Sequence, residues 1–282
     1  MQMDKILVVG AGQMGSGIAQ VAAQSGYSVC LYDIDSKALE KGKASVIKNL
    51  DRQVEKGKLS SEEKEAALSR LSCVESLKSG NDASFVIEAA VEDMEIKAKI
   101  FAEIDSLLPK ETIFATNTSS LPITEIASHT GRPEKFIGMH FMNPVPVMPL
   151  VEIISGQLTD DNVVEFTYEL ANNMGKTPVV VNDFPGFVSN RVLMPMINEA
   201  IFCVYEGVAE PEGVDQVMKL GMNHPMGPLA LADLIGLDTC LYVMEVLHKG
   251  YGDPKYRPCP LLRRYVNAGL FGKKSGRGFY TY

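Results

Sequence analysis

The segment that decides the fold of this chain is KILVVGAGQMG, residues 5–15. The apolar run 5–9 is typical of a buried strand, and the three glycines that follow have the spacing G-x-G-x-x-G at the start of an apolar helix. A second apolar run, 29–32, leads into Asp33, 18 residues after Gly15. Glycines in this spacing also occur by chance, but the order strand, glycines, helix, strand and acid predicts a βαβ unit that binds a dinucleotide.

The residues of this unit are suited to that task. Gly10 and Gly12 allow a tight turn and bring backbone amides close to a pyrophosphate, while Gly15 lets the helix pack closely on its strand. The helix N-terminus offers unpaired N–H groups and a partial positive charge. Asp33 can accept hydrogen bonds from an adenosine ribose and would repel a 2′-phosphate, which favours NAD over NADP. The alternative is a glycine-rich turn followed by a solvated aspartate.

Length and composition restrict the class of protein. At 282 residues the chain exceeds the size at which one core usually suffices, so two domains are expected. The net charge of −8 argues against a general nucleic-acid-binding surface and leaves a local basic patch as the alternative. The five cysteines form no C-x-x-C pair, which fits reduced thiols and indicates no metal site. With no signal peptide and no membrane-spanning run, we expect a soluble cytoplasmic protein.

Hydrophobic patterns divide the chain near residue 184. Alternating strands and helices predict an α/β domain over 1–184, with a Rossmann-type, doubly wound and mostly parallel sheet. Strand-like patterns then disappear, so 185–282 is predicted to be a smaller all-helical domain. Strands are expected at 5–9, 29–32, 84–90, 112–116, 136–140, 150–154 and 178–181. Helices are expected at 37–56, from 60 onward, and at 96–108, 163–174, 188–205, 211–220, 229–247 and 261–266.

His140 and Glu152 form the first candidate chemical pair. His140 ends one apolar run, and Glu152 interrupts another, where an ionised carboxylate is costly unless it is paired. The proline-rich loop between them can place the two strands side by side. A carboxylate would then fix the imidazole tautomer, and histidine is suited to moving a proton near neutral pH. The alternative is a core histidine and an unrelated edge glutamate.

Polar residues at two other positions are candidates for substrate binding. The segment 117–121 follows the strand 112–116 and therefore lies at the carboxyl end of the sheet, where such folds bind ligands. Its hydroxyl groups can equally cap the next helix, through Thr118 or Ser120. Asn190 and Arg191 follow the turn-rich segment 182–186 and open the helical domain. They are either cleft residues or part of an exposed helix turn.

Three cations, Lys48, Arg52 and Lys56, follow one another at four-residue intervals and form what we name the basic stripe. Residues at this spacing share one face of a helix. On an acidic protein the stripe can attract a phosphorylated substrate. Asp51 and Glu55 lie beside it, so a solvated face of mixed charge is the alternative.

The ordered motifs resemble those of the short-chain L-3-hydroxyacyl-CoA dehydrogenases over essentially the whole chain. The matching segments are 10–15, 88–92, 117–121, 138–144, 150–154, 185–191, 224–228 and 274–280. Pro149 departs from the family pattern, which commonly has lysine at this position.

The resemblance implies roles for the matching residues. His140 would be the acid or base at the 3-hydroxyl group, Glu152 would orient it, and Ser119 and Asn190 would bind the reacting oxygen or the thioester carbonyl. The basic stripe would contact the CoA phosphates, and the helical domain would form a homodimer. The residues implied in NAD binding are Gly10, Gly12, Gln13, Met14, Gly15, Asp33, Ala89, Glu92, Lys97, Asn117 and Asn143.

The reaction expected from this resemblance is the NAD-dependent interconversion of 3-hydroxyacyl-CoA and 3-ketoacyl-CoA with a short acyl chain. Two alternatives stay open at this point. One is a dehydrogenase of a free hydroxy acid or sugar acid on the same scaffold. The other is a non-catalytic protein that binds NAD, which would not require His140, Glu152, Ser119 and Asn190 together.

Overall fold

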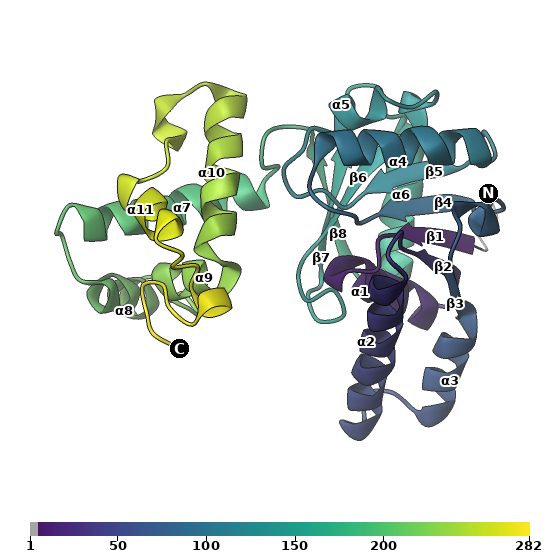
Figure 1. Cartoon of the computed structure of the whole chain (residues 1–282), viewed down its shortest axis with the longest axis horizontal. Helices are drawn as coiled ribbons and strands as arrows, with labels where there is room; N and C mark the ends of the chain where they lie inside the picture. The colour runs from purple at the N-terminus through teal and green to yellow at the C-terminus, as the bar shows by residue number, and fades with distance from the viewer. Residues whose placement is uncertain (1–4) are drawn as a thin grey trace. The chain divides into compact units, whose positions relative to one another are not determined.

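A computed structural model describes residues 5–282 of the chain (Figure 1). The chain divides into two compact units, Met1–Asp183 and Phe184–Tyr282. The division falls one residue before the domain boundary expected from the sequence. Among residues 5–282, no helix has the length and apolar character needed to cross a bilayer.

The first unit contains an eight-stranded sheet with the order β3-β2-β1-β4-β5-β6-β7-β8. Neighbouring strands are parallel except β6 and β7, which are antiparallel. The first six strands have the order found in Rossmann folds, so the predicted fold class is confirmed. The strands are β1 (Lys5–Val9), β2 (Ser28–Tyr32), β3 (Leu71–Val74), β4 (Phe85–Glu88), β5 (Ile113–Thr116), β6 (Phe136–Phe141), β7 (Leu150–Ser155) and β8 (Thr177–Asn182).

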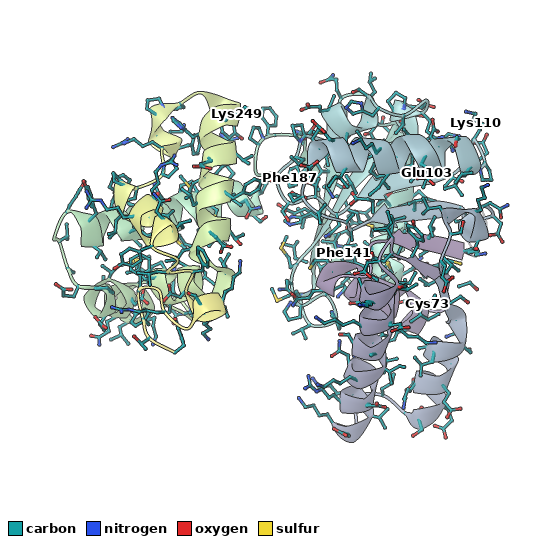
Figure 2. The ribbon with its side chains drawn as sticks, in the orientation of Figure 1. Cys73, Glu103, Lys110, Phe141, Phe187 and Lys249 are labelled. Atoms are coloured by element: carbon teal, nitrogen blue, oxygen red, sulfur yellow. The ribbon has the colours of Figure 1, made fainter. Side chains whose placement is uncertain are left out.

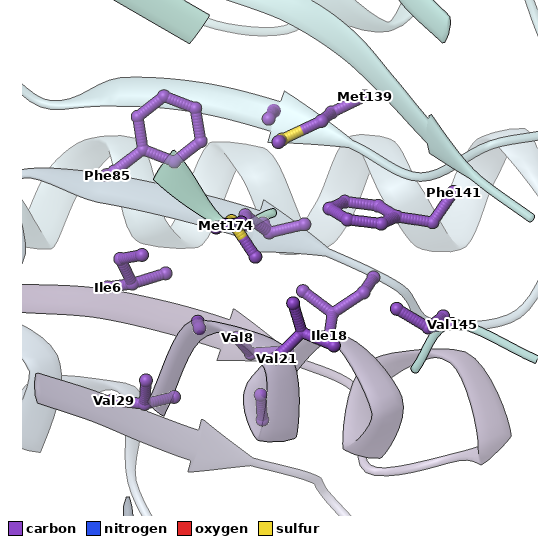
Figure 3. Packing of buried hydrophobic residues seen from close by; sticks show 14 of the residues in the cluster. Ile6, Val8, Ile18, Val21, Val29, Phe85, Met139, Phe141, Val145 and Met174 are labelled. Atoms are coloured by element: carbon purple, nitrogen blue, oxygen red, sulfur yellow. The ribbon is translucent and has the colours of Figure 1, made fainter. Parts of the chain in front are cut away.

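Helices cover both faces of this sheet because successive strand residues point to opposite sides. On one face, apolar residues of α1 and α6 pack on strand residues such as Ile6 and Met139 (Figure 3). On the other face, the Phe101 ring of α4 lies 4.6 Å from that of Phe136. Exposed side chains such as Glu103 extend from α4 (Figure 2). The helices are α1 (Gln13–Gln24), α2 (Ser36–Glu55), α3 (Ser61–Arg70), α4 (Met94–Leu107), α5 (Ile123–Ala127) and α6 (Asp161–Asn173).

Two short elements of this unit were not located by the sequence prediction, which gave no strand near residue 71 and expected a helix after 117–121 without assigning its bounds. Strand β3 has four residues at the edge of the sheet, and only Leu71 of them is buried. Helix α5 has five residues and no side-chain cap from its own N-terminal neighbour. Neither segment is long enough to show a hydrophobic period, so local pattern alone does not mark them.

The second unit is helical and has its own apolar core. The single helix predicted over 229–247 is wrong, because the chain forms two helices that meet at Gly236. This glycine has φ = +105°, a conformation that side chains disfavour, and it ends the first helix. The helices are α7 (Ser189–Tyr205), α8 (Pro211–Gly221), α9 (Pro228–Ile235), α10 (Leu237–Tyr251) and α11 (Pro260–Asn267).

Candidate active site

Polar side chains gather at the carboxyl ends of β4, β5 and β6, on one face of the sheet. Glu88 pairs with Thr116 in the register of β4 and β5, and His140 pairs with Glu152 in that of β6 and β7. The alternation of strand residues places these side chains on the face opposite to the apolar cluster of Figure 3. The sheet therefore brings together four residues that are far apart in the sequence.

His140 and Glu152 are in direct contact. His140 Nδ1 lies 2.8 Å from Glu152 Oε2, and both residues are buried. The contact follows from the antiparallel register of β6 and β7, which sets the two residues opposite each other. With Nδ1–H donating to the carboxylate, Nε2 is the ring nitrogen able to accept a proton. Chemically, the pair is able to take up or release one proton.

Glu88 is a buried carboxylate that was not among the predicted site residues. It is fully buried and accepts hydrogen bonds from Lys97 Nζ, Thr116 Oγ1 and the backbone N–H of Ala90. The sequence did contain a pattern that marks this residue, because Glu88 is a carboxylate at the end of an apolar strand, just as Glu152 interrupts one. Lys97, expected among the cofactor residues, is 1% exposed, and its ammonium donates to both oxygens of Glu88.

Glu92 holds the loop that follows β5. Its Oε1 accepts hydrogen bonds from the backbone N–H groups of Ser119 and Ser120 and from the hydroxyls of Thr118 and Ser120. Its Oε2 lies 3.7 Å from Lys97 Nζ. Four donors on one oxygen fix the position of this loop, so Ser119 is presented at the same edge of the sheet as His140.

The capping alternative for Thr118 and Ser120 is wrong. Helix α5 is capped from the end of β8, because the Asp183 carboxylate accepts the N–H groups of Ile123 and Thr124. Since Asp183 is 60 residues from Ile123 along the chain, no local sequence pattern marks it as the cap.

The glycine-rich loop packs as a dinucleotide site requires. A Cβ atom on Gly10 would lie 2.6 Å from Ala89 O, and one on Gly15 would lie 1.8 Å from Gly10 O. A Cβ on Gly12 would meet nothing within 4 Å, so open space lies in front of the helix N-terminus. The first turn of α1 contains no acidic residue, and Gly12 makes no side-chain cap. The glycine-rich loop and the N-terminus of α1 therefore fit the pyrophosphate of NAD.

Asp33 lies beside the same loop. Its Oδ2 accepts the N–H of Ala11 at 2.7 Å, and its Oδ1 accepts the N–H of Asp35 at 3.0 Å. Each carboxylate oxygen has a second lone pair. Asp33 can thus hold the loop and still accept ribose hydroxyls.

The loop between β6 and β7, residues 142–149, reaches back to α1. Asn143 Oδ1 accepts a hydrogen bond from Gln13 Nε2 at 3.0 Å. Asn117 Oδ1 accepts the N–H of Phe141 and so joins the ends of β5 and β6. Met14 and Ala89 are partly exposed beside the glycines. These residues, predicted to line the NAD site, lie at one edge of the sheet.

The remaining predicted residues lie elsewhere. Asn190 belongs to the second unit, in the first turn of α7, and its closeness to His140 stays a prediction. Lys48 and Arg52 are exposed on α2, and Lys56 is its C-cap residue. The structure, over residues 5–282, shows no ion pair for these three cations. With a rise of about 1.5 Å per residue, Lys48 lies roughly 18 Å along α2 from Ser36, the first residue of this helix.

Comparison with known proteins identifies the family. Residues 5–184 match the 3-hydroxyacyl-CoA dehydrogenase NAD binding domain, and residues 186–282 match the 3-hydroxyacyl-CoA dehydrogenase C-terminal domain. The chain belongs to the 3-hydroxyacyl-CoA dehydrogenase family. The resemblance predicted from the motifs is confirmed, and the family assignment makes the protein an NAD-dependent oxidoreductase.

Similar family members are known from bacteria. The chain is 61% identical over 282 residues to the probable 3-hydroxybutyryl-CoA dehydrogenase of Bacillus subtilis, covering 100% of this chain and 98% of that protein. It is 58% identical to the protein of the same name from Deinococcus radiodurans, covering 99% and 100%. The crystal structure of (S)-3-hydroxybutyryl-CoA dehydrogenase from Ralstonia eutropha has a TM-score of 0.98 at 49% identity, covering 100% and 99%.

Proposed function

We propose that this protein interconverts (S)-3-hydroxyacyl-CoA and 3-ketoacyl-CoA with a short acyl chain, as in 3-hydroxybutyryl-CoA and acetoacetyl-CoA. The observation that carries the proposal is the 2.8 Å contact between His140 and Glu152, at the sheet edge that also presents the glycine-rich loop. The names of the bacterial relatives support the short acyl chain.

His140 is the proton-transfer group in this proposal. In the oxidising direction its Nε2 takes the proton of the 3-hydroxyl group, and in the reducing direction it returns that proton to the 3-keto oxygen. Glu152 keeps Nδ1 protonated and stabilises the positive charge that the ring gains. When bound, NAD supplies the complementary chemistry, since its nicotinamide ring accepts or gives the hydride at C3 of the substrate.

Ser119 and Asn190 bind the substrate in this proposal. The Ser119 hydroxyl hydrogen-bonds the oxygen at C3, and the four bonds that Glu92 accepts keep this loop in place. Fixed donors of this kind favour a reacting geometry because little reorganisation is needed during the reaction. Asn190 contributes from the helical unit.

The basic stripe is our candidate for the CoA phosphates. Its three cations have no carboxylate partner within residues 5–282, which leaves their charge available to a polyanion. If the stripe binds CoA, Lys56→Glu raises KM for acetoacetyl-CoA several-fold and leaves KM for a truncated acetoacetyl thioester unchanged. Equal changes for both thioesters would mean that the stripe is only a solvated face.

The assembly and location of the protein complete the proposal. Large apolar side chains are exposed on the helical unit, and Val192, Val217 and Leu220 are 65%, 63% and 84% exposed. Such residues are typical of a subunit interface, so a homodimer through this unit is proposed, and sedimentation equilibrium measures it. All five cysteines are free thiols, which supports a reducing, cytoplasmic location.

One assay tests the activity. NADH oxidation is followed with acetoacetyl-CoA, with longer 3-ketoacyl-CoA substrates, and with the free keto acids. The expected result is the highest kcat/KM with acetoacetyl-CoA. Turnover of a free acid with no preference for the thioester favours the free-acid dehydrogenase instead, and NADH binding without turnover of any substrate favours a binding protein.

A further inference from the structure

Lys176 is a buried cation outside the site described so far. It directly precedes β8 and is 9% exposed. Its ammonium donates hydrogen bonds to the backbone carbonyls of Val145 and Met148. Within residues 5–282 it forms no ion pair with a carboxylate, and burial lowers its pKa from the ordinary lysine value.

A buried ammonium of this kind is expensive for the fold. Its desolvation is offset only by two carbonyl dipoles, whereas the other buried lysine described above, Lys97, has Glu88 as its counter-ion. Methionine has a similar length and would avoid that cost, but it would leave the carbonyls of Val145 and Met148 without their donor. Both hydrogen bonds of the ammonium go to the same loop, so the role of Lys176 is to be sought in that loop.

The two carbonyls belong to the loop 142–149, which joins three parts of the site. The loop links the strand of His140 to the strand of Glu152. Asn143 on this loop accepts a hydrogen bond from Gln13, at the start of α1. Val145 packs against α1, since a Cβ on Gly17 would lie 2.9 Å from Val145 Cβ, and Figure 3 shows it near Ile18.

We propose that Lys176 is a positioning residue that holds the loop 142–149 against the dinucleotide-binding helix and thereby sets the affinity for NAD. This inference rests on the proposed function, because it assigns Asn143 to the cofactor site. Without the two bonds to its carbonyls the loop is less restrained, and Asn143 is no longer held where a bound cofactor needs it. The substrate thioester is not part of this effect.

The test compares Lys176→Met and Lys176→Gln with the wild-type protein, and uses Lys135→Met as a control for the loss of a lysine elsewhere in the same unit. Lys135 also donates to a backbone carbonyl, that of Lys110, and it forms an ion pair with Glu111. It lies directly before β6, away from the loop 142–149. Three quantities are measured: the Kd of NADH by fluorescence titration, the free energy of unfolding in urea, and the KM values of NADH and acetoacetyl-CoA.

The expected result is a Kd and a KM for NADH raised on the order of tenfold in Lys176→Met, with KM for acetoacetyl-CoA unchanged. The free energy of unfolding should change little, because removal of the buried charge offsets the loss of the donor to the two carbonyls. Lys176→Gln retains a shorter donor, so its Kd and KM for NADH should lie between those of the wild type and those of Lys176→Met. Lys135→Met should bind NADH like the wild type.

Two outcomes overturn the proposal. One is an unchanged NADH affinity in a folded Lys176→Met. The other is a loss of unfolding free energy in both variants, up to failure to fold, because Lys176 would then serve stability. A wild-type protein that binds NADH but does not reduce acetoacetyl-CoA refutes the proposed function instead, and the comparison of Kd values still decides the role of Lys176.

Discussion

Both units of this protein bury carboxylates, but they partner them differently. At the edge of the sheet, Glu88 contacts the cation of Lys97, and Glu152 contacts the imidazole of His140. In the helical unit, the partners that residues 5–282 provide to Asp215 and Asp233 are only backbone N–H groups and tyrosine hydroxyls, which donate hydrogen bonds to them.

The partner of each carboxylate indicates its use. An imidazole can both accept and donate a proton, so the pair of His140 and Glu152 is suited to proton transfer. Backbone amides do not titrate, so Asp233 is suited to fastening the segment 269–282, through Phe279 N at 3.0 Å and Tyr280 N at 2.9 Å. A Cβ on Gly278 would lie 2.0 Å from Asp233 Oδ1, which explains a glycine in this tail.

The largest effect is expected from His140→Gln. It removes the proton-transfer group, and kcat should fall by about 10²–10⁴ while the free energy of unfolding changes little. Steady-state kinetics and urea unfolding measure the two quantities, and His129→Gln, on an exposed histidine, is the control. A near-normal rate would refute the catalytic role and remove the contrast between the two units.

Asp233→Ala should lower the stability of the protein rather than its catalytic function. It leaves two backbone N–H groups and the hydroxyl of Tyr282 without their acceptor, so the free energy of unfolding should fall by about 3 kcal/mol. Calorimetry measures this loss, and NADH affinity should stay unchanged while the variant is folded. Glu245→Ala, which breaks an exposed ion pair with Arg263, is the control and should cost under about 1 kcal/mol. Equal losses in both variants would contradict the fastening role.

Glu152→Gln tests the comparison between the carboxylates of the two units more finely, because it preserves the shape of the side chain and removes only the charge beside His140. We expect kcat to fall by roughly 10–100-fold, as is usual when the residue that orients a functional histidine is lost. The pH profile of kcat/KM should also move, since the charge of the neighbouring carboxylate acts on the imidazole. An unmoved profile from pH 5 to 9 would show that the pair is structural, like those of the helical unit.

The smallest effect is expected at Tyr282. Burial and the nearby Asp233 carboxylate raise the pKa of Tyr282 to about 12, against about 10 for an unfolded tyrosine. The native state therefore keeps a proton that the unfolded chain loses, so this stabilisation is complete below pH 10 and disappears as the pH rises toward 12. Because the side chain is half-exposed, the effect should be small.

Tyr282→Phe measures that contribution. The difference in unfolding free energy between the wild type and this variant should shrink as the pH rises from 10 to 12. A difference that stays constant over this range would mean that the hydroxyl is not coupled to Asp233.

The sequence by itself determined the local features of this protein. The run 5–15 and Asp33 indicated the βαβ unit because each of its requirements, an apolar strand, small residues at a turn and an acid after the next strand, is local. The same holds for the long helices of the first unit and for the helix start near residue 60, where Ser60 and Glu63 form a capping box. The suspected pairing of His140 with Glu152 came from one local anomaly, a carboxylate within an apolar strand.

Tertiary structure decided the contacts between distant segments. Three contacts join residues far apart in the chain: the hydrogen bond from Thr116 to Glu88, the Asp183 cap of α5, and the contact of Lys176 with loop 142–149. The break at Gly236 rests on a backbone conformation, φ = +105°, that the hydrophobic pattern of the sequence does not record. A linear pattern records the polarity and period of neighbours, whereas the partner of a buried charge is set by strand order and register.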